Sequence, residues 1–257
     1  MSNRKSSVIL IVLLSLLILF FLGVLVHGLT NNGGNKKVKL MSENEYSLSE
    51  FNKINISTTS SDIKIMHSDD EKVKVKVYAT DDDKVVNEVK DNELNVSIKG
   101  KNRFNFCFFC FIKGNKRMEI YLPKEYAGSF DVKLTSGDLK AASYPNAKLK
   151  AKFTSGDLEI NSIKDATIRL TSGDVKINNI NNYAHIKATS GDIKIDKFNI
   201  NKDSYIKITS GDVVIKETSD AYINAKVTSG DIDINNSNRK AEHELKIKAT
   251  SGDISVN

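Results

Sequence analysis

The sequence repeats one short motif that carries a hydroxyl and a carboxylate, two groups that could do chemistry. Thr-Ser-Gly-Asp occurs seven times, and its copies begin at Thr135, Thr154, Thr171, Thr189, Thr209, Thr228 and Thr250. The steps between copies are 19, 17, 18, 20, 19 and 22 residues, a period typical of stacked β-coils. A catalytic nucleophile is a single, specially placed group. The sevenfold serine therefore indicates architecture, and no enzymatic activity is predicted.

The seven aspartates would form a row if the coils stack in register. Neighbours about 4.8 Å apart would repel each other by on the order of 1 kcal/mol in water. A cation such as calcium could offset this repulsion; alternatively, N–H groups of the turn hold each carboxylate while solvent and lysines screen it. Hard cations normally collect several oxygen ligands, whereas each coil offers one carboxylate. The turn interpretation is favoured, and no metal or other cofactor is predicted.

A basic residue stands two positions before each threonine of the motif. These residues are Lys133, Lys152, Arg169, Lys187, Lys207, Lys226 and Lys248. In a row on one outer face they could bind an anionic wall polymer or lipid headgroups. The alternative is a solvated face that keeps the sheet soluble, and the acidic residues interspersed nearby dilute any charged stripe.

Cys107 and Cys110 lie in a phenylalanine-rich segment, residues 103–111. A local disulfide, two unpaired core cysteines, and redox or metal chemistry all stay open as interpretations. Three steps along a flat strand span roughly 10 Å, whereas a disulfide needs Cα atoms within about 7 Å, so a disulfide here requires a turn. The phenylalanines either form an exposed contact patch or cap the end of a core.

Alternating apolar residues predict the strands that must position these groups. Apolar residues stand one and three positions before each threonine, and again one and three positions after each aspartate. The inward parity changes across Ser-Gly-Asp, so the motif must be a bend between two strands. We call this bend the corner; its predicted residues are Gly137, Asp138, Gly156, Asp157, Gly173, Asp174, Gly191, Asp192, Gly211, Asp212, Gly230, Asp231, Gly252 and Asp253.

The expected fold is all-β, a solenoid-like stack of about 17–22-residue coils. Each coil has a strand, a corner, a second strand and a polar return loop such as residues 177–183. Residues 49–257 form the repetitive domain, with 49–126 as a diverged part and 127–257 as seven regular repeats. A degenerate copy of the motif, residues 59–62, ties the diverged part to the same structure.

One transmembrane helix is expected before the β domain. Residues 8–26 carry no charge, and nineteen helical residues span roughly 28 Å, close to the hydrocarbon thickness of a bilayer. The interpretation is a cytoplasmic tail at 1–7, a signal anchor at 8–27 and a linker at 28–48; a cleaved secretory signal is the alternative. We therefore expect a single-pass protein of the cell membrane with its large domain outside the cytoplasm.

Charge and histidine spacing exclude some classes of binding partner. The net charge of +6 comes from 38 basic and 32 acidic residues, too slight an excess to indicate nucleic acid binding. The four histidines are far apart and lack metal-ligand spacing. The membrane, an envelope protein or an anionic polymer remain as expected partners.

The chain also resembles a known family over roughly residues 50–257. Its N-terminal apolar segment, the strand end Tyr121-Leu122-Pro123 and the iterated Ser-Gly-Asp coils are similar to the toastrack, or putative-adhesin, family of bacterial envelope proteins. The resemblance implies a surface scaffold, or an accessory of an envelope-stress response, and it supplies no catalytic residues.

Overall fold

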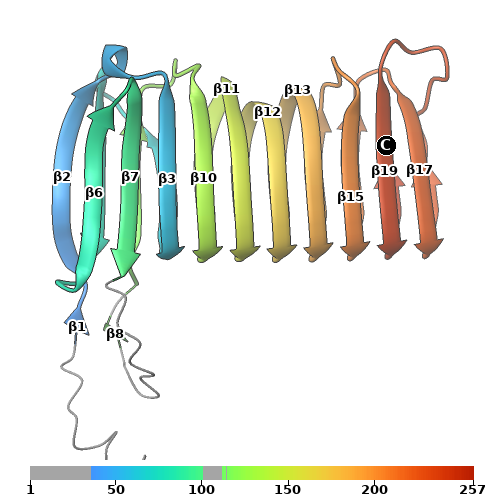
Figure 1. Cartoon of the computed structure of the whole chain (residues 1–257). Helices are drawn as coiled ribbons and strands as arrows, with labels where there is room; N and C mark the ends of the chain where they lie inside the picture. The colour runs from blue at the N-terminus through green and yellow to red at the C-terminus, as the bar shows by residue number, and fades with distance from the viewer. Residues whose placement is uncertain (1–35, 101–111, 114) are drawn as a thin grey trace, which may run out of the picture. The chain divides into compact units, whose positions relative to one another are not determined.

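The computed structural model describes residues 36–100, 112–113 and 115–257, and their regular structure is almost entirely β (Figure 1). Strands β1 (Lys36–Lys37) and β8 (Ile112–Lys113) pair in parallel and belong to one compact unit; residues 39–101 and 115–257 make up the other, which holds the repeats. The strands of the repeat unit are β2 (Lys39–Ser47), β3 (Lys53–Ser60), β4 (Asp62–His67), β5 (Lys72–Ala79), β6 (Asp83–Lys90), β7 (Glu93–Gly100), β9 (Arg117–Leu122), β10 (Ser129–Ser136), β11 (Leu139–Ser155), β12 (Leu158–Ser172), β13 (Val175–Ser190), β14 (Ile193–Phe198), β15 (Ser204–Ser210), β16 (Val213–Thr218), β17 (Tyr222–Ser229), β18 (Ile232–Ile234), β19 (Glu244–Ser251) and β20 (Ile254–Val256). A short 3-10 helix, η1 (Leu48–Glu50), follows β2.

The repeats form two facing layers of mostly parallel strands. The β10 layer contains the strands that lead into the corners and runs in the order β6-β7-β3-β10-β11-β12-β13-β15-β19-β17. The β4 layer contains the strands that leave them and runs in the order β2-β5-β9-β4-β11-β12-β13-β14-β16-β20-β18. Strands β11, β12 and β13 take part in both layers because each continues from one coil into the next.

Every corner of the repeats brings two glycine backbones into contact. Leu134 and Leu139 on either side of the first corner are buried, so the inward parity changes between them as the alternation requires. Gly137 between them has a φ of 121°, and all seven corner glycines have φ between 112° and 131°. A Cβ on Gly173 would overlap the carbonyl oxygen of Gly156 in the preceding coil. Only glycine fits both constraints.

The core is one continuous apolar column between the layers. It extends from Ile54 and Ile56 of β3 to Ile247 of β19, all buried to 1% exposure or less. Because β3 and β4 pair with β10 and β11 in the same register as the regular repeats, the diverged part belongs to the same column.

The returns of the early coils differ from the polar loops expected from the sequence. Residues 177–183 lie within β13, and β11 and β12 also continue through their returns, with register shifts after Tyr144 and Ile163. Tyr144, Ile163, Ile180 and Phe198 stack in register at this position and are buried. Their side chains fill the core at the return. The sequence does not reveal this burial because the residues around these four are rich in asparagine.

The last two coils are stacked in the reverse of their sequence order. Strand β19 pairs with both β15 and β17, and β20 pairs with both β16 and β18, so the final coil of the chain is inserted before the preceding one (Figure 1). The step between Thr228 and Thr250 is the longest in the chain, 22 residues, and it supplies the connection 235–243 that makes this return. The coil formed by β17 and β18 is consequently the end of the stack.

The opposite end of the stack is closed by an N-terminal strand. Residues 39–47, assigned above to the linker, form β2, which pairs with β5 in antiparallel orientation. The hydroxyl of Tyr46 donates to the carbonyl oxygen of Asn87 in β6 at 2.7 Å, and this bond joins the two layers. The linker expected at residues 28–48 is therefore too long. Strand β2 lies at an edge and is little buried, so it has polar residues on both faces and lacks the apolar alternation that identifies a strand in the sequence.

Several expectations fall on residues outside the described ranges. These are the cytoplasmic tail (1–7), the signal anchor (8–27) and the pair Cys107 and Cys110 with the surrounding phenylalanines. Within residues 36–100, 112–113 and 115–257, no helix is long and apolar enough to cross a membrane.

A glycine substitution in the middle of the stack tests the corner. Gly173→Ala should lower the free energy of unfolding by at least about 2 kcal/mol, because the Cβ both meets the Gly156 carbonyl and is disfavoured at a φ of 123°. Gly100→Ala is the control, since a Cβ there meets its nearest atom at 4.0 Å. Urea unfolding of the two variants measures the difference, and equal stabilities would contradict the steric argument.

Candidate ligand-binding face

The corner aspartates form a ladder in which each carboxylate except the last, Asp231, accepts a backbone N–H from the next coil of the stack. The donor and acceptor pairs are Asp138 N to Asp62 Oδ1 (3.3 Å), Asp157 N to Asp138 Oδ1 (3.0 Å), Asp174 N to Asp157 Oδ1 (2.9 Å), Asp192 N to Asp174 Oδ1 (2.8 Å), Asp212 N to Asp192 Oδ1 (2.9 Å), Asp253 N to Asp212 Oδ1 (2.8 Å) and Asp231 N to Asp253 Oδ1 (2.9 Å). The degenerate motif supplies the first rung at Asp62.

These hydrogen bonds offset the repulsion between stacked carboxylates. A hydrogen bond to a charged acceptor stabilises the fold by about 1.5–3 kcal/mol. The repulsion between two neighbouring carboxylates in water costs less, on the order of 1 kcal/mol. In the described part of the chain, no group of three or more His, Cys, Asp or Glu side chains could hold a metal ion. The carboxylates of the ladder are thus held by backbone N–H groups of neighbouring coils.

The seven basic residues predicted as a row do lie side by side on the outer surface of the β10 layer. Register pairs Lys133 with Lys152, Lys152 with Arg169, Arg169 with Lys187 and Lys187 with Lys207. Lys248 and Lys226 follow, in the reversed order of the last two coils. We call this set the cation row. None of its members forms an ion pair with any residue whose position the structure describes.

The corresponding outer row of the β4 layer is different. It has mixed charge, and register aligns Lys140 with Glu159 and Glu159 with Lys176. Glu159 pairs with both lysines, at 3.0 Å and 3.4 Å. The hydrogen bond and charge of Lys140 lower the pKa of Glu159, and Lys176 adds to the effect. An acidic residue therefore interrupts this row, whereas the cation row contains none, although Lys64 and Lys194 at either side of these three residues also form no ion pair within the described part of the chain.

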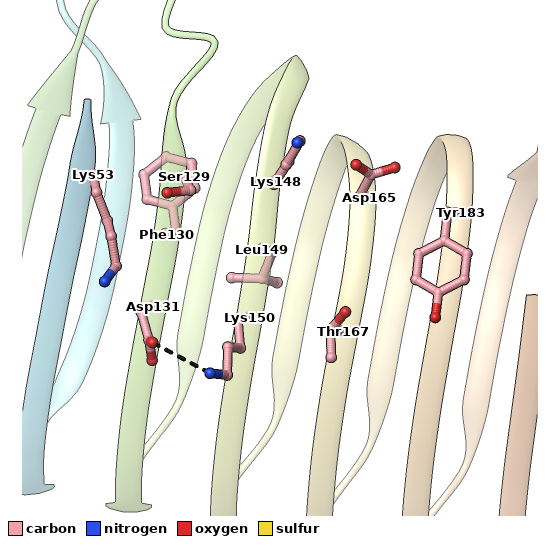
Figure 2. A pocket seen from close by; sticks show the side chains of 10 residues that line it. All are labelled: Lys53, Ser129, Phe130, Asp131, Lys148, Leu149, Lys150, Asp165, Thr167 and Tyr183. Carbon is pink, nitrogen blue, oxygen red and sulfur yellow. Dashed lines mark ion pairs between the residues drawn. The ribbon is translucent and has the colours of Figure 1, made fainter.

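A shallow pocket of about 360 Å³ adjoins the cation row on the same layer, toward the returns (Figure 2). It crosses β3, β10, β11, β12 and β13, and its charged and aromatic lining residues are Lys53, Phe130, Asp131, Lys148, Lys150, Asp165 and Tyr183. Lys150 and Asp131 face each other across it at 3.8 Å. The pocket thus offers charges of both signs and two aromatic residues, the buried Phe130 and the more accessible Tyr183, beside the cation row.

An aromatic group lies next to the row in the later coils. The rings of His185 and Tyr205 are 5.5 Å apart, and the Lys187 ammonium lies 5.7 Å from the centre of the Tyr205 ring. Burial and then the positive charges of Lys187 and Arg169 lower the pKa of His185, so this imidazole is neutral near pH 7. Alternation predicts the outward basic residues, but the aromatic neighbours come from different coils and became evident only through register.

Comparison with known proteins agrees with this architecture. A family model described as Toastrack DUF4097 matches residues 51–257. A solved structure of a "putative adhesin" from Bacteroides fragilis has a TM-score of 0.52 at 18% identity, covering 85% of this chain and 97% of that one. A "putative cell adhesion protein" from Clostridium sporogenes has a TM-score of 0.40 at 17% identity, with coverage of 85% and 98%. At 18% identity, the similarity to the B. fragilis protein concerns the fold alone. The comparison with curated proteins found no match.

Two substitutions at one rung distinguish a backbone-held ladder from a cation-held one. Asp174→Ala should cost about 1–2 kcal/mol of unfolding free energy, because the Asp192 N–H loses its acceptor. Asp174→Asn keeps an oxygen acceptor and should cost clearly less. Calcium removal with EDTA should leave the melting temperature of the unmodified chain unchanged. A drop in melting temperature with EDTA, together with equal losses in the two variants, would instead indicate a bound cation.

Proposed function

The chain belongs to the Toastrack family, and we propose that it is a membrane-anchored, adhesin-like scaffold outside the cytoplasm that binds an anionic polymer of the cell envelope. The single observation that carries the proposal is the unpaired cation row on the β10 layer. Seven like charges about one strand spacing apart repel each other, and a polyanion laid across the strands would relieve that repulsion.

The contrast between the layers supports a binding role over simple solubility. A solvated face needs charges of either sign, and the β4 layer meets that need with Glu159 between two lysines. The cation row instead keeps one sign from β10 to β17. A rigid sheet also holds these charges at fixed spacing, so the entropy lost on binding an extended polymer falls mainly on the polymer.

The pocket and the aromatic group suggest that the anionic polymer contains sugar units. Glycopolymers present ring faces and hydroxyl groups as well as anions; Tyr183 and Tyr205 offer aromatic surface, and Asp131 and Asp165 offer acceptors. An adhesin-like role is consistent with the fold shared with the B. fragilis protein. The family resemblance implies a role as an accessory of an envelope-stress response. A protein whose β10 layer contacts envelope polymers would be suited to that role.

Charge reversal on the row tests the binding proposal. The full chain in mild detergent should sediment with purified cell-wall sacculi, and this binding should fall steeply between about 50 mM and 300 mM salt because the charges are exposed. Lys152→Glu, Arg169→Glu and Lys187→Glu together should reduce the bound fraction at least tenfold. Sacculi stripped of phosphate polymers should bind less of the unmodified chain.

The β4 layer supplies the matched control. Lys64→Glu, Lys140→Glu and Lys194→Glu change the net charge by the same amount on exposed positions of the other layer. This variant should keep most of the binding. Equal losses in the two triple variants would attribute binding to net charge alone and overturn the role of the row.

The position of the domain is tested separately. Alkaline phosphatase, which is active only outside the cytoplasm, should be active when fused after Asn257 in intact cells. A fusion that is inactive, while a cytoplasmic reporter at the same position is active, would overturn the membrane orientation without bearing on polymer binding.

A further inference from the structure

The two ends of the repeat stack are built differently. At the first end, β2 and β6 join the layers through Tyr46 and Asn87, and Phe51 is buried behind them. At the other end, β19 is the one strand of the described chain that pairs with β17, and β20 the one that pairs with β18, so each of these two strands has an edge without a described strand beside it. Ile232 of β18 is 42% exposed, whereas Ile254, its register partner in β20, is 1% exposed. The last coil therefore presents a cross-section of the core.

Part of the free edge is already covered by the connection 235–243. Ser237 accepts the N–H of Ile223 at 3.0 Å, and Asn238 donates its N–H to the carbonyl of Ala221 at 3.0 Å. Since backbone groups alternate along a strand, Ala225 and Val227 present theirs on the same free side as Ile223. No residue with a described position covers the edge nearer the corner.

The corner of the last coil also lacks the partner that every earlier corner has. In the coil before it, Gly252 N donates to Ser229 O at 3.0 Å and Ile254 N donates to Asp231 O at 2.9 Å. The equivalent N–H groups of Gly230 and Ile232, and the Asp231 carboxylate, have no such partner within the described chain. Donors and an acceptor therefore stand together at the end of the ladder.

We propose that this end docks against the same end of a second copy of the chain, with β17 of one copy antiparallel to β18 of the other. A two-fold axis along the strand direction brings the two corners to the same side and places each β17 beside the partner copy's β18. Such a contact is isologous and closes after two copies, because the other end of each stack is capped.

Charge selects this arrangement. Lys226 lies three residues before Ser229, and Asp233 lies three residues after Gly230, so the two are level on opposite layers of one coil. Pairing β17 with the second copy's β18 sets Lys226 beside Asp233 twice. The alternative two-fold axis, perpendicular to the layers, would bring like strands together, so Lys226 and Asp233 would lie on different layers and could not pair.

The backbone register agrees with the charges. By the same symmetry about the corner, Val227 is level with Ile232 and Ala225 is level with Ile234. Asn235 donates its N–H to the carbonyl oxygen of Val256 in β20. Because backbone groups alternate along a strand, the backbone N–H and C=O groups of Ile232 and Ile234 point to the free side. Antiparallel pairing thus sets residues with free backbone groups opposite one another and covers the apolar side chains exposed at the end.

The test uses the full chain in detergent micelles. Sedimentation equilibrium should show a reversible dimer, and Lys226→Glu should weaken association by about ten- to a hundredfold, since it places glutamate beside Asp233. Combining it with Asp233→Lys should restore the dimer. Lys207→Glu, in the same row but inside the stack, is the control and should leave association unchanged.

Carbodiimide coupling gives an independent readout on the unmodified protein. A mixture of ¹⁴N- and ¹⁵N-labelled chains should yield a mixed-isotope peptide in which Lys226 is joined to Asp233 by an amide; within one chain these residues lie on opposite layers and cannot couple. A monomer at all concentrations, a dimer insensitive to Lys226→Glu, or coupling confined to single-isotope pairs would each overturn the proposal. None of these results bears on binding to sacculi.

Discussion

The close approach of glycine backbones at the corners is the constraint on which the rest of the structure depends. A corner such as Gly173 packs against the carbonyl of the previous corner, with a backbone conformation that other residues rarely adopt. This contact fixes the register of both layers at once, because a strand enters and a strand leaves at the same point. The Asp174 carboxylate then binds the next corner's N–H and repeats the spacing along the stack.

Because the register is fixed, residues that recur at the same position of each repeat lie side by side on one surface. Because Lys152, Arg169 and Lys187 occupy the same place in successive coils, the stack converts them into a continuous charged strip. The β4 layer shows that this outcome is not automatic, since the same geometry there places Glu159 between two lysines. The polymer proposal accordingly rests on the difference between two layers built by one repeat.

A repeat stack must also end, and its two ends manage exposed core differently. A polar antiparallel strand closes the first, with Tyr46 bonded across to β6. The second keeps Ile232 exposed and the backbone edges near its corner free. Repeat proteins generally need a capped end for solubility. A second copy supplies such a cap while leaving both cation rows on outer surfaces, so end-to-end pairing and polymer binding are compatible.

The sequence by itself determined the β period, the change of parity at Ser-Gly-Asp and the outward position of the basic residues, because each follows from local alternation and from glycine's backbone freedom. Strand β2 and the buried return residues such as Ile180 were missed, since polar neighbours mask them. The reversed order of the last two coils, the grouping of His185 with Tyr205 and the free end at Ile232 were decided by the tertiary structure alone. Near-identical repeats specify how any two coils stack, but only the length of the connections and the packing of the whole column decide which coils are neighbours.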